Sequence, residues 1–249
     1  VSDWSSDVCS SDLALEAAAR AGKRLFVLDR VNPITGARFE GPIMTRPPSF
    51  IGFHPLPVSH GMTLGELARL FNAERRFGAQ LEVVACENWT RDRWYDDTGL
   101  PWVNPSPSMR SLTAATLYPG LCLLEGTVIS MGRGTAKPFE QVGAPFVDGA
   151  RLATELNARG LPGVRFDPVR FTPAMDFYPG PAASLKHKDR ECGGVRVVLT
   201  DRAACRAVDV GIELALALRR LYPREFNVDA MARLLGDDET LHADRKSVV

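Results

Sequence analysis

The first third of the chain alternates between helix and strand patterns, and this order restricts the fold more than any other feature. Apolar residues at helical spacing cover 13–22, a short buried strand pattern follows over 23–29, and the same pair recurs over 62–78 and 81–86. Between the pairs, the Pro- and Gly-rich connection 30–61 predicts no regular element. Helix–strand–helix–strand order is typical of an α/β layered domain, and we expect the earlier strands of that layer to be missing.

A domain boundary is expected near Thr98, inside a stretch rich in proline and tryptophan that shows no sustained period. The residues beyond it mix strand and helix patterns. In chain order they predict a strand, a helix, two strands and two helices, over 121–126, 150–160, 163–173, 193–201, 208–223 and 228–236. The predicted fold class is therefore α/β: part of a layered domain over 13–98, followed by a mixed α+β domain over 99–243.

The two ends of the chain do not follow the patterns between them. Residues 1–12 are dense in Ser and Asp and have neither helical nor strand period, and residues 244–249 read DRKSVV. We interpret both segments as translated sequencing-adapter sequence, and we expect the residues between them to be part of a longer protein. A natural disordered tail at each end is the alternative.

The charge balance gives no reason to expect a nucleic-acid or membrane partner. The chain has 30 basic and 30 acidic residues, and setting the two end segments aside leaves a small positive balance. No apolar run approaches the ~20 residues that a membrane-spanning helix requires. Outside the end segments no two cysteines form a CxxC pair, so no metal site is predicted and a disulfide stays open. These cysteines are Cys86, Cys122, Cys192 and Cys205.

Several polar phrases stand where ligand-binding residues commonly lie. Asp29 and Arg30 directly follow a predicted strand, at the end where α/β sheets bind their ligands. An Asp–Arg pair that fixes the turn is the structural alternative. His60 directly precedes a predicted helix, where it can donate a hydrogen bond to a ligand or cap the helix. Glu40, in FEGP, is interpreted as a turn residue.

The stretch LLEGTVISMGRGTAKPFE, residues 123–140, combines three glycines with two acids and an arginine. Glycine permits backbone torsions and close approaches that other residues do not. Arg133, between two glycines, can extend a planar, permanently charged guanidinium toward a carboxylate or a phosphate. Glu125 can act as an acid, a base or an acceptor for a sugar hydroxyl, whereas an internal Glu–Arg ion pair is the structural alternative. The stretch lacks the lysine and the spacing of a phosphate-binding P-loop.

Taken together, these phrases resemble the NamZ family, whose members are exo-acting β-N-acetylmuramidases of peptidoglycan. The resemblance covers residues 14–236. It rests on a series of motifs in order: LDRVNPITG, FEGP, PLPVSHGMTLGELA, LPWVNPSPSM, YPGLCLLEGT, GRGTAKPFEQVGAPFVDG and CGGVRVVLTDR. It implies a Rossmann-like N-terminal domain and a smaller C-terminal α/β domain, with the active site in the cleft between them. It also implies release of N-acetylmuramic acid from the non-reducing end of peptidoglycan fragments, a periplasmic or secreted location, and no cofactor.

The resemblance and the chemistry together give a set of candidate substrate-binding residues. N-acetylmuramic acid carries a lactyl carboxylate and a 2-acetamido group, so we expect Arg133 to bind the carboxylate and Glu125 or Asp29 to bind sugar hydroxyls. We also expect Glu125 and Arg133 to face Asp29 or His60 across the domain boundary. The full set is Asp29, Arg30, Asn32, His60, Glu125, Arg133 and Glu140.

The catalytic residue itself is not assigned. The resemblance implies a Pro-Glu-His-Gly motif whose glutamate is the proposed catalytic residue of the family, and this sequence has no such motif. Glu125 is the fallback, and we expect the fragment alone to be inactive. Two other classes of function stay open. One is a non-catalytic module that binds peptidoglycan or another carbohydrate, and the less favoured one is an α/β domain that binds an anion or a nucleotide.

Overall fold

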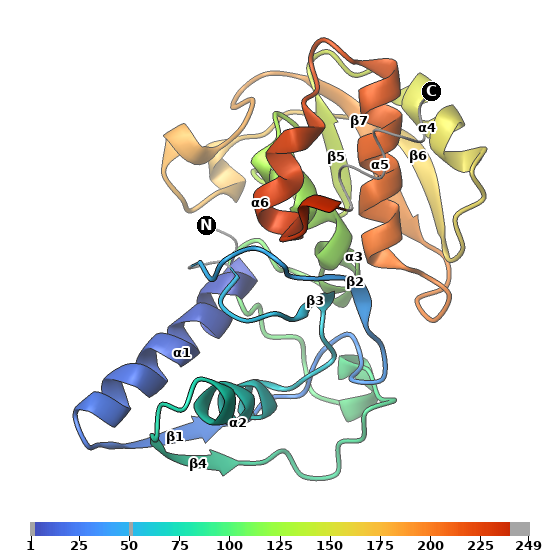
Figure 1. Ribbon diagram of the computed structural model, residues 1–249. Helices are drawn as coiled ribbons and strands as arrows, with labels where there is room; N and C mark the ends of the chain where they lie inside the picture. Colours follow the sequence, from blue (N-terminus) through green and yellow to red (C-terminus); the bar gives the residue numbers. More distant parts are fainter. Residues whose placement is uncertain (1–2, 50–51, 240–249) are drawn as a thin grey trace.

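The first part of the chain contains a parallel pair of strands, an antiparallel hairpin and two helices (Figure 1). The computed structural model describes residues 3–49 and 52–239. Strands β1 and β4 pair in parallel, with Leu28 opposite Val84, and strands β2 and β3 form the hairpin. In chain order the elements are α1 (Asp3–Arg20), β1 (Arg24–Leu28), β2 (Glu40–Ile43), β3 (Pro57–Ser59), α2 (Leu64–Glu74) and β4 (Gln80–Val84).

Helices α1 and α2 contact each other and pack against the β1–β4 pair. A capping box closes the N-terminus of α2: the Thr63 Oγ1 accepts from the Glu66 N–H at 3.2 Å, and the Thr63 N–H donates to Glu66 Oε2 at 3.0 Å. A small core is buried between helices and strands, formed by Leu15, Leu67, Ala68, Phe71 and Ala79. The two helices and two strands predicted for this part are thus confirmed in type.

One face of the β1–β4 pair is exposed, although both strands were expected to be buried. Phe26, Leu28 and Val84 are 53 %, 71 % and 51 % exposed. Their neighbours Leu25 and Val27 are half-buried and pack on the small core. Because successive side chains of a strand point to opposite faces, one face packs on the helices and the other presents apolar side chains to solvent. An exposed apolar face of this kind favours association between molecules.

Exchanging an exposed residue of this face for a polar one is expected to raise solubility without loss of stability. We predict that Leu28→Thr changes the free energy of unfolding by less than ~0.5 kcal/mol and raises the concentration at which light scattering detects aggregates. The matched change on the covered face, Val27→Thr, places a hydroxyl against the small core and is expected to cost about 1–2 kcal/mol. Equal costs for the two variants in urea unfolding would contradict this assignment of the faces.

The second part is built around an antiparallel sheet in the order β5-β7-β6 (Figure 1). Helix α4 packs on β6 and β7, helix α3 packs on α5, and together they enclose the main hydrophobic core. Asp148 caps α4 by accepting a hydrogen bond from the Arg151 N–H at 3.1 Å. The elements are α3 (Leu112–Leu121), β5 (Gln141–Ala144), α4 (Gly149–Asn157), β6 (Val164–Phe171), β7 (Cys192–Leu199), α5 (Ala207–Leu221) and α6 (Ala232–Leu235). The helices and strands predicted beyond residue 150 are confirmed, the last one as a 3-10 turn followed by α6.

Two local predictions are wrong because the sequence signal is short or interrupted. The strand predicted over 121–126 is the end of α3 and a 3-10 helix, Cys122–Gly126. A short apolar run does not distinguish a strand from a buried helix, and Pro119 inside α3 hides its helical period. The connection 30–61, for which no element was predicted, contains the β2–β3 hairpin.

The N-terminal helix is longer than predicted. Helix α1 begins at Asp3 and not near residue 13, so residues 3–12 are helical and not irregular. Asp12, within this segment, is buried. Residues 244–249 lie outside the described residues. The adapter origin of both end segments and the domain boundary near Thr98 stay predictions. Within residues 3–49 and 52–239, no helix is long and apolar enough to cross a membrane.

The β2–β3 hairpin connects the two parts of the chain. Glu40 is buried, and its Oε2 accepts a hydrogen bond from the Val208 N–H at 3.2 Å, close to the N-terminus of α5. The Thr45 N–H donates to the Gly236 carbonyl at 3.0 Å, just beyond α6. Glu40 is therefore not merely a turn residue: negative charge is favourable near the N-terminus of a helix, and here it joins two distant segments.

Candidate functional site

A small pocket lies beside the loop that leaves the carboxyl end of β1, and we call it the strand-end pocket. Its volume is about 90 Å³, and Arg30, Asn32, His60 and Trp102 are among the residues that line it. The structure therefore brings together three residues that the sequence placed in one candidate set. The carboxyl end of the strands is where α/β sheets commonly bind ligands.

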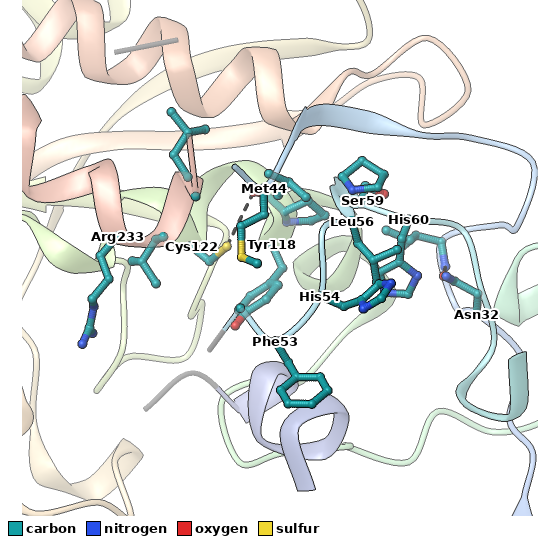
Figure 2. A pocket seen from close by; sticks show the side chains of 18 of the residues that line it. Asn32, Met44, Phe53, His54, Leu56, Ser59, His60, Tyr118, Cys122 and Arg233 are labelled. Atoms are coloured by element: carbon teal, nitrogen blue, oxygen red, sulfur yellow. Dashed lines mark hydrogen bonds between the residues drawn. The ribbon is translucent and has the colours of Figure 1, made fainter. Parts of the chain in front are cut away.

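A larger pocket adjoins the first and lies between the β2–β3 hairpin and helices α3 and α6 (Figure 2). This hairpin pocket has a volume of about 220 Å³ and shares Asn32 and His60 with the strand-end pocket. None of the described residues that line either pocket is an aspartate or a glutamate. The polar residues that line the hairpin pocket include Asn32, His54, Ser59, His60, Tyr118 and Arg233.

His60 is a neutral imidazole with a defined hydrogen-bonding direction. Its Nδ1 accepts a hydrogen bond from the Met62 N–H at 3.1 Å, so we assign the ring proton to Nε2. Burial lowers the pKa of His60 to about 4, against a smaller opposing effect of the Glu66 charge. At neutral pH the Nε2–H is therefore a fixed donor where the strand-end and hairpin pockets meet.

The lowered pKa of His60 makes stability depend on pH. Below the unfolded-state pKa of about 6.5, the unfolded chain binds a proton that the folded chain does not bind until about pH 4. Stability is expected to fall as pH drops from 6.5 to 4, by up to about 3 kcal/mol from this group. Urea unfolding between pH 4 and pH 7 measures the slope, and His60→Gln should flatten it. Equal slopes for the parent and the variant would contradict the prediction.

Asp29 and Asn32 shape the loop beside these pockets. The Asp29 carboxylate accepts from the Gly65 N–H at 2.7 Å and from the Thr63 hydroxyl at 2.9 Å, so it holds the N-terminus of α2 and lines neither pocket. Asn32 donates from Nδ2 to the Met62 carbonyl at 3.1 Å and is buried. Arg30, by contrast, is exposed at the mouth of the strand-end pocket.

Glu125 and Arg133 line a third cavity, of about 600 Å³, which we call the arginine groove. The Arg133 Nε donates to Glu125 Oε1 at 2.7 Å, and its Nη1 donates to the Ser108 hydroxyl at 3.1 Å. The guanidinium also lies over the Phe139 ring, 4.8 Å from its centroid. Both partners of the pair are mostly buried, at 16 % and 17 % side-chain exposure, so the structure shows the internal ion pair. The groove is further lined by Tyr178, Lys186 and Arg233.

The glycines around Arg133 serve the packing of the chain itself. Gly132 and Gly134 have φ of +70° and +76°, which favours glycine. A Cβ on Gly132 would lie 2.7 Å from the Lys137 carbonyl oxygen, and one on Gly134 would lie 3.0 Å from that of Ala174. The close approach inferred from these glycines is therefore made by neighbouring backbone.

Glu140 is a structural residue in this fold. It is buried, and its Oε1 accepts from the Ser111 hydroxyl at 2.7 Å while its Oε2 accepts from Lys137 Nζ at 3.0 Å. Ser111 in turn caps α3. Glu140 lines none of the strand-end pocket, the hairpin pocket and the arginine groove.

The expected meeting of Glu125 and Arg133 with Asp29 or His60 is not found. Glu125 and Arg133 line the arginine groove, whereas His60 lines the strand-end and hairpin pockets. The hairpin pocket and the arginine groove adjoin at α6, because both are lined by Arg233 and Leu234. The candidate residues thus divide between two neighbouring sites.

Sequence reasoning missed His54 and Arg233. His54 lies in the irregular segment before β3, where no motif marks it, and Arg233 belongs to a helix pattern whose exposed arginine looks like an ordinary surface residue. Among the residues that the structure describes, no hydrogen bond or ion pair holds the Arg233 guanidinium. Arg233 lines both the hairpin pocket and the arginine groove because α6, the helix that carries it, packs between them. Within residues 3–49 and 52–239, no three His, Cys, Asp or Glu side chains are grouped so that they could hold a metal ion.

The fold and its cavities define a two-part α/β protein with mainly apolar pockets, which carry a few polar side chains, at the strand ends and between its parts. Comparison with known sequences is more specific, and the chain belongs to the NamZ family. The family description "Exo-beta-N-acetylmuramidase NamZ, N-terminal" matches residues 9–113, and the C-terminal description matches residues 116–246.

Relatives of known sequence or structure are longer than this chain. It is 44 % identical over 214 residues to the Bacillus subtilis protein named peptidoglycan beta-N-acetylmuramidase NamZ, a match that covers 86 % of the chain and 50 % of that protein. Two crystal structures of DUF1343 family proteins from Bacteroides fragilis are similar, with TM-scores of 0.82 and 0.69 and identities of 30 % and 28 %. Each covers 94 % of this chain, which spans 62 % and 61 % of them. The chain thus spans about half the length of the curated relative.

Proposed function

We propose that this chain forms part of an exo-β-N-acetylmuramidase, which releases N-acetylmuramic acid from the non-reducing end of peptidoglycan fragments. The observation that carries the proposal is the match of both NamZ descriptions, together with 44 % identity to a protein named for this activity. The proposed substrates are muramyl saccharides. The proposed location is the periplasm or the cell exterior, where peptidoglycan is found.

In this proposal the described residues bind and orient the sugar, and the proton donor lies elsewhere in the whole protein. Glycosidases normally use two carboxyl groups beside the scissile bond, and with a 2-acetamido sugar the substrate's own carbonyl can replace one of them. No described residue that lines the strand-end or hairpin pocket is acidic. Glu125 is held by Arg133 in the arginine groove.

Arg233 is the residue that we propose to bind the lactyl carboxylate. Arg133, the expected partner, is occupied by Glu125 and Ser108. Arg233 lines the hairpin pocket at the end opposite to His60 and Asn32 (Figure 2). A guanidinium that none of the described residues holds can donate two charge-assisted hydrogen bonds to a carboxylate.

The test uses the whole protein, obtained by joining this chain to the residues of the Bacillus subtilis relative that lie outside the match. We expect the chimera to release free N-acetylmuramic acid from fragments that end in this sugar. Fragments that end in N-acetylglucosamine, the matched control, should stay intact because they lack the lactyl carboxylate. Cleavage inside the glycan, or equal cleavage of both fragments, would overturn the exo-muramidase assignment.

A second candidate is a non-catalytic module that binds peptidoglycan, and the absence of acidic side chains among the described residues of both pockets favours it. Such a module would bind muramyl saccharides without consuming them. In the same experiment, saturable binding of the saccharide by a folded chimera without any release of sugar would select this candidate.

A further inference from the structure

The arginine groove carries more positive than negative charge. Among its described lining residues, Arg133, Lys186 and Arg233 are basic, and Glu125 is the one acid. Glu125 and Arg133 neutralise each other in their ion pair. Neither Lys186 nor Arg233 forms an ion pair with any residue that the structure describes. Two cations therefore line a cavity of about 600 Å³ without a described anion to balance them.

The ammonium group of Lys186 is held at the wall of this groove. Its Nζ donates to the Glu125 carbonyl at 2.7 Å and to the Ile129 carbonyl at 3.2 Å. Gly126 and Ser130, which directly follow these two carbonyls, line the groove themselves. An ammonium has three N–H donors, and no group in the described ranges accepts from the third. Burial lowers the pKa of Lys186, an effect that a bound anion would offset.

A close backbone contact brings Arg233 to the same wall. A Cβ added to Gly126 would lie 2.1 Å from the Ala230 carbonyl oxygen and 3.9 Å from Leu234 Cδ1, so the start of α6 touches the backbone that Lys186 holds. Arg233, which directly precedes Leu234, is exposed at the end of the hairpin pocket (Figure 2). The contact at Gly126 thus places both cations beside one segment of the groove wall.

We propose that the arginine groove binds the carboxylate carried by the 3-O substituent of a muramyl saccharide, with Lys186 as the second cation beside Arg233. The sugar ring lies in the hairpin pocket, which adjoins the groove at Arg233. A carboxylate has two acceptor oxygens, so it can accept from the Arg233 guanidinium and from the third N–H of Lys186. This assignment rests on the proposed function and makes Lys186 a residue that distinguishes muramic acid from glucosamine.

The test compares N-acetylmuramic acid with N-acetylglucosamine, which lacks the lactyl carboxylate, for binding to the chimera by calorimetry. We expect the parent to prefer N-acetylmuramic acid, and Lys186→Gln to reduce this preference about tenfold through loss of one charge-assisted hydrogen bond. Glutamine keeps an N–H donor for the backbone carbonyls and removes the charge. Affinity for N-acetylglucosamine should stay unchanged. An undiminished preference in Lys186→Gln would overturn the assignment.

The matched control is Lys188→Gln, the same change two residues further along the chain. Lys188 pairs with Asp189 and lines none of the three cavities, so this variant should keep the preference of the parent. An equal loss in both variants would show a general effect of net charge and would overturn the assignment.

A third ligand distinguishes the two sources of the carboxylate. In N-acetylmuramyl-L-alanyl-D-isoglutamine the lactyl group is an amide, and the carboxylate belongs to the peptide. Weaker binding of N-acetylmuramic acid alone in Lys186→Gln supports the groove as a site for the lactyl carboxylate. Weaker binding of the muramyl peptide alone supports it as a site for the peptide carboxylate.

A measurement on the unmutated chimera keeps the assignment testable where Lys186→Gln does not fold. Nitrogen NMR of the lysine side chains should show N-acetylmuramic acid or the muramyl peptide shifting Lys186 Nζ, with no shift on addition of N-acetylglucosamine. The absence of a shift with both acidic ligands at saturation overturns it. Release of N-acetylmuramic acid with an unchanged preference in Lys186→Gln overturns the groove assignment alone. Lost preference in that variant without any hydrolysis by the parent supports the groove and overturns the hydrolase.

Discussion

Replacing Gly120 by alanine is expected to destabilise the fold by more than about 3 kcal/mol, because helices α3 and α5 touch at this residue. A Cβ built on Gly120 would lie 1.7 Å from the Ala207 carbonyl oxygen and 3.0 Å from the Gly211 nitrogen. The contact is reciprocal, since a Cβ on Gly211 would lie 2.2 Å from the Gly120 carbonyl oxygen. The obstructing atoms belong to the backbone, so a helix must shift within the main core.

Packing and helix propensity predict opposite changes in the free energy of unfolding for Gly120→Ala. Alanine is favoured over glycine inside a helix by about 1 kcal/mol, so propensity alone predicts a more stable variant. The matched control is Gly99→Ala, where φ is +71° and nothing lies within 4 Å of an added Cβ. It should cost only about 1–2 kcal/mol through backbone strain. Urea unfolding measures both variants. A cost at Gly120 no larger than that at Gly99 would contradict the packing.

The elements that the sequence predicted correctly have long or well-bounded patterns. The helix α2 has a capping box at Thr63, and α4 has its cap at Asp148. The run 121–126 has no such signal. Its leucines Leu121, Leu123 and Leu124 are buried in the main core, which is formed by segments distant in the sequence. Gly120 becomes informative only when Gly211 is known to face it. The β2–β3 hairpin is likewise held from outside its own segment, by bonds such as that of Glu40 to Val208.

The candidate site was predictable to the extent that topology determines it. Arg30, Asn32 and His60 flank one strand end and one helix start, so a parallel strand pair with its helix brings them to the same place. Arg133 was expected to bind a substrate carboxylate, but the structure shows the alternative, an ion pair with Glu125 within the protein. Arg233 could not be found from its spacing, because its position in two cavities results from the packing of α6.

The chain by itself is expected to release N-acetylmuramic acid ~10² to 10⁴-fold more slowly than the chimera. This factor is the typical loss of rate when a group that transfers a proton is removed. The reason is geometric. None of the described residues of the strand-end and hairpin pockets is acidic, and Glu125, in the arginine groove, is fixed by a 2.7 Å bond from Arg133. In the proposed function, pockets without a positioned carboxyl group bind the sugar but cannot protonate the leaving oxygen. Release of the sugar from a chromogenic muramic acid glycoside measures both rates.

The variant Glu125→Gln in the chimera distinguishes a structural role of Glu125, as the ion-pair partner of Arg133, from a role as the catalytic acid. If Glu125 only holds Arg133, the variant should lower the melting temperature while kcat changes by no more than a few fold, because the reacting atoms are bound elsewhere. A loss of ~10² to 10⁴-fold in kcat at an unchanged melting temperature would instead make Glu125 the proton donor. That result, or rapid turnover by the chain alone, would move the reaction from the histidine-lined pocket to the arginine groove.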